Sequence, residues 1–340
     1  MVEKKTAFSN ESKDRTKESL KTNANTVTIN LFSGALAGGA AKTIIAPLDR
    51  AKINFQIHKD IPYSFRATAI FLQNTYQKEG FLALWRGNSA TMARIIPYAA
   101  IQFTSHEQWK KILSVDKDRS TTVRRFIAGS FAGITSQSFT YPLDLARARM
   151  AVTDKYTGYK SLRHVFAHIW INEGPKALLR GYWATIFGVI PYAGTSFFTF
   201  ETLKRKHHEL TGEKRPQALF SLGYGAIAGV IGQTTSYPLD IVRRRMQTVG
   251  MMKKPPNNYR TIVSSLKFIY KHEGIRRGFF KGLSMNWIKG PIANGISFTT
   301  FEYTKDFLSN FKLAVDFFFK SGAATQDPAL MSKVAEYLMR

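Results

Sequence analysis

The feature that most constrains this chain is a six-residue pattern that occurs three times at nearly equal spacing. It reads PLDRAK at 47–52, PLDLAR at 142–147 and PLDIVR at 238–243, about 95 residues apart. Thirteen positions before each proline a GxxxG pair begins, and after each pattern come a basic stretch, an EG dipeptide and then WRG, LRG or FKG. The chain is therefore expected to fold as three copies of one unit.

Each unit also carries two long stretches with almost no charge. Three of them contain no charged residue and three contain a single cation; they cover 22–48, 87–105, 126–143, 181–200, 216–239 and 282–301. Each is close to the ~20 residues that a membrane-crossing helix needs, and their Gly, Ser, Thr and Pro content suits helices packed on other helices. The alternative is a soluble α protein, which we disfavour because six such stretches are hard to bury in 340 residues.

We therefore predict an all-α integral membrane protein with six transmembrane helices in three pseudo-threefold repeats, each with a short surface helix. The repeats are expected at 27–115, 120–211 and 216–312, followed by a C-terminal tail at 313–340. Residues 1–26 are polar and mixed in charge, which predicts a disordered tail. This segment has too many acids for a transit peptide and no apolar core for a secretory signal, so any targeting signal must be internal.

Composition narrows the chemistry. The chain carries 49 Lys and Arg against 23 Asp and Glu, a net charge of +26, which indicates an anionic partner such as nucleic acid, anionic lipid or an acidic solute. It has no cysteine, its histidines are scattered, and it shows no nucleophile, metal or paired-carboxylate motif. We expect neither an enzyme nor a resident cofactor or metal.

Three PxDxx[KR] motifs, each tied to an EG…[RK]G element, resemble the mitochondrial carrier family over about residues 27–312. The resemblance implies a monomeric, multi-pass transporter of the mitochondrial inner membrane, with both termini on the intermembrane-space side and the short helices on the matrix side. Transport would occur by alternating access between two gates. A nucleic-acid-binding protein is disfavoured because the arginines interrupt apolar stretches instead of gathering on one polar face.

The acid and the cation of each motif stand three residues apart and so share a helix face. Buried charge is costly in a membrane unless it is paired, and threefold symmetry lets each acid meet the cation of another repeat. In the family's arrangement the pairs form a matrix gate, and glutamines nine residues after the proline brace them, with Ala151 in the middle repeat lacking that function. The expected gate pairs and braces are Asp49–Arg147, Asp144–Arg243, Asp240–Lys52, Gln56 and Gln247.

A second pattern, an acid followed three residues later by lysine, ends each unit. By the same resemblance it implies a cytoplasmic gate made of Glu107–Lys204, Glu201–Lys305 and Glu302–Lys110. The prolines of the three PxDxx[KR] motifs are expected to bend their helices inward. The alternative for both rings is a permanent structural role. We favour gating, because buried ion pairs add little net stability and so suit reversible contacts.

Charges inside membrane helices are functional candidates. Arg94 and Lys289 each stand thirteen residues before a glutamate of the second pattern, and the matching position in the middle unit is Gly188. These positions match the family's substrate contact points, where two cations would bind phosphates and the Gly188-Val189 pair would accept a flat adenine. Snorkelling of the cations to headgroups is the alternative. The expected substrate residues are Lys42, Arg94, Gly188, Val189, Tyr192 and Lys289. For Tyr192, ordinary helix packing is an equal alternative to stacking on the base.

The start of each second helix offers backbone N–H groups to a phosphate. In the family such sites hold cardiolipin, and here they would be Arg86-Gly87, Arg180-Gly181 and Lys281-Gly282.

Longer stretches, such as 85–103 and 188–204, resemble the coenzyme A-transporting branch of that family. This implies exchange of coenzyme A for adenine nucleotides, including ADP and 3′,5′-ADP. An ATP/ADP or ATP/phosphate carrier remains the alternative, because those substrates present nearly the same groups. A membrane scaffold or proton leak without a specific solute is a further alternative.

Overall fold

A computed structural model describes residues 2–58, 61–115, 121–154, 156, 158–213, 216–251 and 257–321. Side chains are not described for 2–28, 121–122, 218, 257 and 312–321. The chain divides into two compact units, one made of 1–42 with 292–340 and the other of 43–291. The second unit holds most of the motifs identified above.

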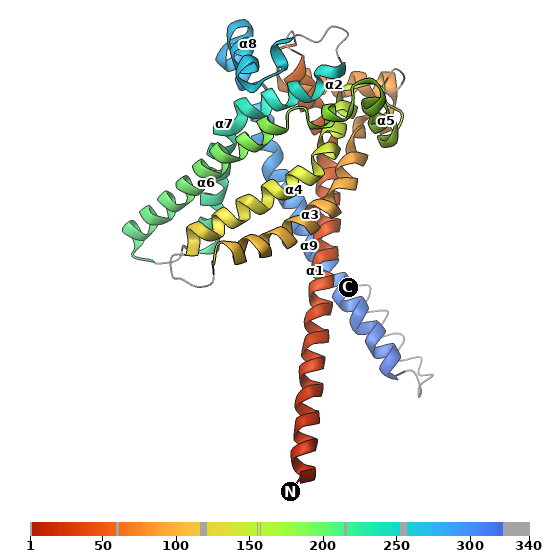
Figure 1. Ribbon diagram of the computed structural model, residues 1–340, viewed down its shortest axis with the longest axis vertical. Helices are drawn as coiled ribbons and strands as arrows, with labels where there is room; N and C mark the ends of the chain where they lie inside the picture. Colours follow the sequence, from red (N-terminus) through yellow and green to blue (C-terminus); the bar gives the residue numbers. More distant parts are fainter. Residues whose placement is uncertain are drawn as a thin grey trace. The chain divides into compact units, whose positions relative to one another are not determined.

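The described residues form long helices, short helices and single turns, without a strand. The long helices are α1 (Val2–Ile57), α3 (Asn88–Ile112), α4 (Thr121–Val152), α6 (Tyr182–Thr211), α7 (Ala218–Thr248) and α9 (Leu283–Ser321). The short helices are α2 (Phe65–Glu79), α5 (Leu162–Asn172) and α8 (Ile262–Gly274), and the turns are η1 (Phe81–Trp85), η2 (Pro175–Leu179), η3 (Val249–Met251), η4 (Asn257–Tyr259) and η5 (Ile275–Phe279). Within 43–291, α3 packs along α4 and α6 packs along α7 (Figure 1).

The same local rules shape each repeat. The short helices begin where a hydroxyl of Ser64, Ser161 or Thr261 accepts a backbone N–H of the first turn. The glycine of each EG dipeptide has a positive φ and reverses the chain into the following turn. A second positive-φ glycine, at 87, 181 and 282, then starts the next long helix. These turns explain why the EG and [RK]G elements recur.

Apolar cores lie between the first long helix of each repeat (α1, α4 or α7) and the short helix of the same repeat. In the second repeat Tyr141 and Leu145 of α4 pack with Val165 and Ile169 of α5. Tyr237 and Ile241 of α7 pack with Ile269 of α8 in the third repeat. These cores hold the PLD segments of the second and third repeats in place.

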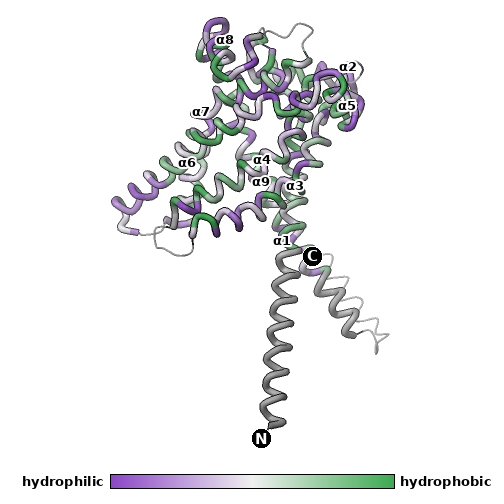
Figure 2. Tube along the Cα trace, viewed as in Figure 1, coloured by the Kyte–Doolittle hydropathy of each residue, from purple (hydrophilic) through white to green (hydrophobic). Residues whose placement is uncertain are grey.

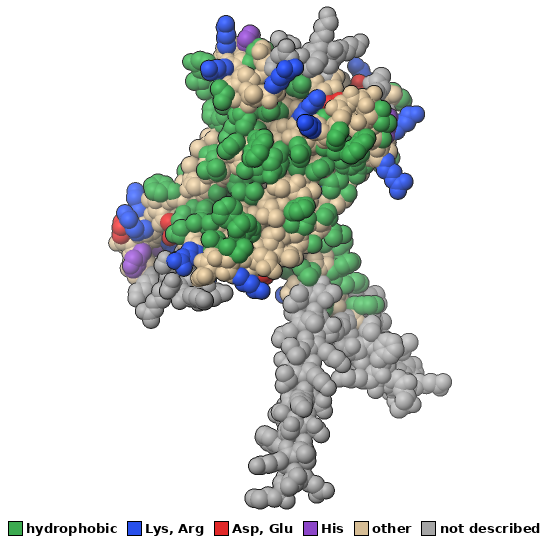
Figure 3. Space-filling model, viewed as in Figure 1, with side chains coloured by type: hydrophobic (Ala, Val, Ile, Leu, Met, Phe, Trp, Pro, Cys, Tyr) green, Lys and Arg blue, Asp and Glu red, His purple; other side chains and the backbone are tan. Residues whose placement is uncertain are grey.

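The long helices of the second unit expose apolar side chains along their middle. Phe131 and Phe139 on α4 and Ile190 and Phe198 on α6 are exposed, and Figures 2 and 3 show apolar residues over the middle of these helices and basic residues towards their ends. By length and composition alone, one described helix, 29–57, is apolar enough to cross a membrane. The other long helices carry Gly, Ser, Thr and interior charges, which lower their mean hydropathy.

The termini differ from the sequence-based expectation. We predicted a disordered tail over 1–26, but α1 begins at Val2. Residues 2–26 contain no glycine or proline to interrupt a helix that starts in the following apolar stretch. Likewise α9 continues to Ser321, so 313–321 of the expected C-terminal tail are helical, while 322–340 lie outside the described residues.

Candidate functional site

A cavity of about 640 Å³ lies among α4, α6 and α7. Gly188, Val189, Tyr192 and Lys289, four of the expected substrate residues, line it. Arg94 stands beside its wall: the guanidinium lies 4.8 Å from the ring centre of Tyr98, a lining residue, and donates to Gln137, another one. Lys42 belongs to the other unit. The cavity therefore combines these two predicted cations with a wall of small residues, and Lys52 and Arg243 line it as well.

The small residues come from the GxxxG segment of α4 as well as from the Gly188 position. Gly129 and Gly133 of α4 line the cavity, so that a flat group can lie close to the backbone. Polar side chains that sequence reasoning did not assign to the site, Ser236 and Asn286, line it too. The buried Nε2 of Gln137 and Oδ1 of Asn286 have no hydrogen-bond partner among the described residues, which leaves a donor and an acceptor at the cavity.

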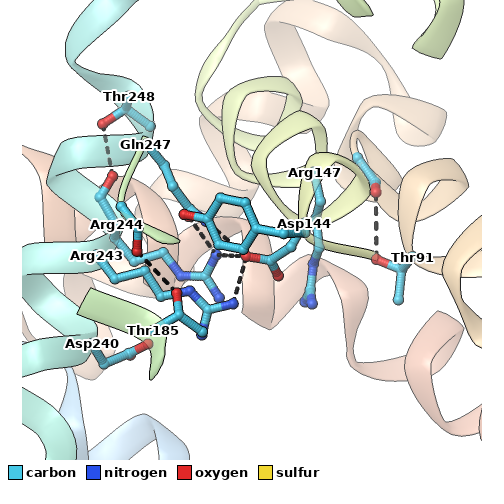
Figure 4. Close-up of polar contacts among 12 residues, drawn as sticks. Thr91, Asp144, Arg147, Thr185, Asp240, Arg243, Arg244, Gln247 and Thr248 are labelled. Carbon is cyan, nitrogen blue, oxygen red and sulfur yellow. Dashed lines mark hydrogen bonds and ion pairs between the residues drawn. The ribbon is translucent and has the colours of Figure 1, made fainter. Parts of the chain in front are cut away.

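Three ion pairs between repeats close one end of the cavity. Arg243 Nη2 lies 2.6 Å from Asp144 Oδ2 (Figure 4), and Lys52 Nζ lies 3.1 Å from Asp240 Oδ2. Arg147 pairs with Asp49. These are the pairings expected for the matrix gate, and we refer to the three pairs together as the matrix ring. The ring joins α1, α4 and α7, which each run through the proline of their PLD motif.

Glutamine braces support two of the three pairs. Gln247 Nε2 donates to Asp144 Oδ2 at 2.8 Å, and Gln56 Nε2 donates to Asp240 Oδ2 at 3.2 Å. Each amide also lies 3.1 Å from a tyrosine hydroxyl, that of Tyr141 or Tyr237. The hydroxyls in turn donate to the carbonyls of Arg180 and Lys281, at 2.5 and 2.8 Å. Each braced pair is thus fixed to the start of α6 or α9.

The third pair, Asp49–Arg147, lacks both supporting groups. Alanine stands at the two equivalent positions, 46 and 151. The tyrosines were not predicted as site residues, although the TYPLD and SYPLD sequences, against IAPLD in the first repeat, carry the signal. The matrix ring is therefore asymmetric.

Additional cations contact two of the acids. Lys289 Nζ lies 2.7 Å from Asp49 Oδ1, and Arg94 Nη1 lies 3.5 Å from Asp144 Oδ1. Arg244 Nη1 is also 3.5 Å from Asp144 Oδ2. Sequence reasoning assigned Lys289 and Arg94 to substrate phosphates alone and did not identify Arg244. Two cations at the cavity, Lys289 and Arg94, thus also contact acids of the matrix ring. Three members of the ring, Lys52, Asp240 and Arg243, line the cavity themselves.

A second buried ring links the repeats beside the first. Arg50, Arg149 and Arg245 pair with the glutamates of the EG dipeptides, Glu79, Glu173 and Glu273. Each arginine also donates Nε to a backbone carbonyl of another repeat, that of Ala151, Gln247 or Gln56. Burial would raise the pKa of Glu173, but the hydrogen bond and charge of Arg149 and the charge of Arg180 outweigh it and lower the pKa.

The expected cytoplasmic gate is not closed where it can be described. Glu107 pairs with Lys110 of its own helix at 2.7 Å instead of with Lys204, because an i,i+3 neighbour is always within reach on a helix. Glu201 and Lys204 lie on α6, with no ion pair between Glu107 and Lys204 in the described second unit. Glu302 and Lys305 belong to the other unit.

The cations expected at lipid sites are engaged by the protein. Arg86 Nη2 donates to the Tyr159 carbonyl at 2.7 Å, Arg180 pairs with Glu173, and Lys281 Nζ donates to the His58 carbonyl at 2.5 Å. Each of these bonds ties a residue just before a long helix to the segment before or after a short helix, at Tyr159, Glu173 or His58. Gly87, Gly181 and Gly282, which precede or begin these helices, have positive φ angles.

Comparison with known proteins identifies this arrangement. The family described as Mitochondrial carrier protein matches three successive segments, 23–117, 118–210 and 214–312. The chain belongs to the mitochondrial carrier family. Its six long helices and three repeats are the carrier fold, and its place is a mitochondrial membrane.

Two kinds of carrier are among its relatives. It is 51% identical to the Mitochondrial coenzyme A transporter SLC25A42 of Xenopus tropicalis, over 84% of this chain and 88% of that protein. It is 54% identical to the human protein of the same name, over 80% and 86%. Human Solute carrier family 25 member 16 is 40% identical over 82% and 87%. These carriers are transporters, as the repeats of this chain predict.

Proposed function

We propose that this carrier exchanges coenzyme A for adenine nucleotides, including ADP and 3′,5′-ADP, across the mitochondrial inner membrane. The observation that carries the proposal is the cavity wall, where Gly188, Val189 and Tyr192 lie with the cation Lys289. Coenzyme A presents a flat adenine, a 3′-phosphate and a pyrophosphate, and these groups match a wall of small residues beside cations. The printed name of the relatives at 51–54% identity supports the same substrate.

Each expected substrate residue has a role in this proposal. Arg94 and Lys289 bind phosphate oxygens, and Lys42 adds a third cation on the first helix. Gly188 and Val189 receive the adenine, and Tyr192, 44% exposed on the cavity wall, stacks on it. The unpartnered amide of Gln137 and oxygen of Asn286 complete the polar contacts.

The state of the two gates supports alternating access. The matrix ring is closed, whereas Glu107 and Lys204 are not paired. We propose that substrate enters from the cytoplasmic side, that the matrix ring then opens, and that the cytoplasmic ring of Glu107, Glu201, Glu302 and their lysines closes. Both termini would lie on the intermembrane-space side.

We propose that the transporter works as a monomer, which is supported by the finding that a single chain supplies every acid and cation of the matrix ring. Cardiolipin headgroups would bind at the starts of α3, α6 and α9, through backbone N–H groups at Gly87, Gly181 and Gly282. Arg86, Arg180 and Lys281 would act there by holding the loops in place as well as by their charge.

Exchange by the purified protein in liposomes tests the substrate. Vesicles loaded with ADP receive labelled coenzyme A, ATP or phosphate outside, and uptake is compared with that of empty vesicles. We expect labelled coenzyme A to enter the ADP-loaded vesicles and not the empty ones. Exchange of ATP or phosphate without coenzyme A would favour the ATP/ADP or ATP/phosphate alternative, and no uptake of any of them would contradict the proposal.

A further inference from the structure

Two cavity cations reach down to the acids of the matrix ring, and they do so in a cyclic pattern. Lys289 of α9 contacts Asp49 of the first repeat, and Arg94 of α3 contacts Asp144 of the second. The third equivalent position is Gly188 of α6, which lies against Leu239, the neighbour of Asp240, and carries no charge. Two of the three ring acids, Asp49 and Asp144, therefore each contact a cation of the cavity.

These two acids differ in the other contacts that they make. Asp144 keeps Arg243 at 2.6 Å, Gln247 at 2.8 Å and Arg244 at 3.5 Å without Arg94, whose own contact is 3.5 Å long. Asp49 has Arg147 on Oδ2 and Lys289, at 2.7 Å, on Oδ1. Because Ala151 stands where the other repeats have a brace glutamine, Lys289 occupies the role of the missing brace.

We propose that Lys289 is a substrate-released latch of the matrix ring: it supports the unbraced Asp49–Arg147 pair until an anionic group of the substrate draws it away. This inference rests on the proposed nucleotide substrate. A phosphate entering the cavity competes with Asp49 for the same ammonium group. Once Lys289 turns to it, Oδ1 of an almost buried carboxylate loses its partner, which destabilises the closed pair. Opening then starts at the edge between the first and second repeats.

Distances between spin labels across that edge provide the test. Gln73 on α2 and Ala167 on α5 are exposed, and the chain has no cysteine of its own, so a Gln73→Cys, Ala167→Cys protein carries only two labels. Double electron–electron resonance on the full-length protein then reports the distribution of distances between the two labels, without ligand and with coenzyme A or ADP. For this labelled parent we expect a closed population, and a longer-distance population after coenzyme A is added.

The decisive comparison is made without ligand, between two variants that each remove one cavity cation. Lys289→Ala is expected to raise the longer-distance population roughly tenfold from a minor state. Arg94→Ala, the matched control, is expected to leave it unchanged because Asp144 keeps its other donors. Lys289→Gln, which retains a hydrogen-bond donor near Asp49, should remain closed. Equal distributions for Lys289→Ala and the parent, or equal opening by both alanine variants, would overturn the latch.

A gain-of-function variant keeps the test sharp if Lys289→Ala does not fold. Ala151→Gln supplies the missing brace and should reduce the coenzyme A-induced longer-distance population of the parent, and it should close Lys289→Ala again where that variant is stable. An undiminished response in Ala151→Gln would contradict the latch. If neither coenzyme A nor ADP changes the parent, the substrate assignment fails, and the ligand-free comparison still decides the role of Lys289.

Discussion

At the scale of single residues, the buried arginines of the second ring carry charges that need several hydrogen-bond partners. Arg149 is fully buried, and it bonds both oxygens of Glu173 and a backbone carbonyl of α7. Arginine suits this position because its planar guanidinium donates in several directions at once. Its removal leaves the backbone carbonyl of Gln247 without its donor and leaves the Glu173 carboxylate with Arg180 alone.

We predict that Arg149→Ala lowers the free energy of unfolding by about 3–5 kcal/mol, the usual cost of breaking a buried ion pair. The matched control is Arg205→Ala on α6, whose 3.3 Å pair with Glu209 is largely exposed; it should change stability by less than about 1 kcal/mol. Thermal unfolding of the purified carrier in detergent measures both. Equal losses in the two variants would show that Arg149 does not depend on its buried contacts.

At the scale of elements, the positive-φ glycines at 87, 181 and 282 decide how closely the second long helix of a repeat approaches the first long helix of another repeat. A Cβ on Gly181 would lie 3.0 Å from the Arg243 carbonyl and 3.0 Å from the Tyr141 hydroxyl. The start of α6 can therefore come this close to α7 only without a side chain. Gly212, at the other end of α6, has a similar φ of 73° but nothing within 4 Å of its Cβ.

This contrast separates backbone strain from close packing. Gly212→Ala should cost only the strain of a left-handed alanine, about 1 kcal/mol, whereas Gly181→Ala should cost clearly more and weaken the Tyr141 contact. The shift in unfolding midpoint of the two variants measures this difference. If Gly181→Ala is no worse than Gly212→Ala, the close approach of α6 to α7 is not essential.

The matrix ring was predictable at this scale, because residues three apart share a helix face and threefold symmetry lets them pair between repeats. The resemblance to the carrier family then indicated which repeat supplies each partner. The contacts of Lys289 with Asp49 and of Arg94 with Asp144 were not predicted. They depend on how α3 and α9 lie along the neighbouring helices, which spacing within a repeat does not encode. The first repeat also hid Arg50, which stands three residues after its proline whereas Arg149 and Arg245 stand seven after theirs, yet it reaches the equivalent glutamate.

At the scale of the whole molecule, the closed end of the cavity is rich in positive charge. The cations that contact the ring acids outnumber them by six to three: they are Lys52, Arg94, Arg147, Arg243, Arg244 and Lys289, around Asp49, Asp144 and Asp240. Such an excess in a partly buried site favours substrates with several negative charges. Phosphate number, and not the base alone, should therefore set the rate.

We predict that the carrier takes up coenzyme A faster than dephospho-coenzyme A and ADP faster than AMP, by roughly tenfold in kcat/KM for one charge-assisted phosphate contact. Raising the salt concentration should narrow the difference, because screening weakens the contribution of charge. Initial rates in nucleotide-loaded liposomes measure both effects. Equal rates for the members of each pair would show that the excess cations do not read phosphate.

The matrix ring as a working gate is the centre of this account, and reversal of one ion pair tests it most directly. The Asp240–Lys52 pair is the best choice, because an arginine placed at Asp144 would face Arg94 and Arg244. The measurement is coenzyme A/ADP exchange by Lys52→Asp, Asp240→Lys and the double variant. We predict that each single change lowers the rate at least about tenfold, and that the double variant recovers a large part of it. A double variant no faster than the slower single one would contradict the gate.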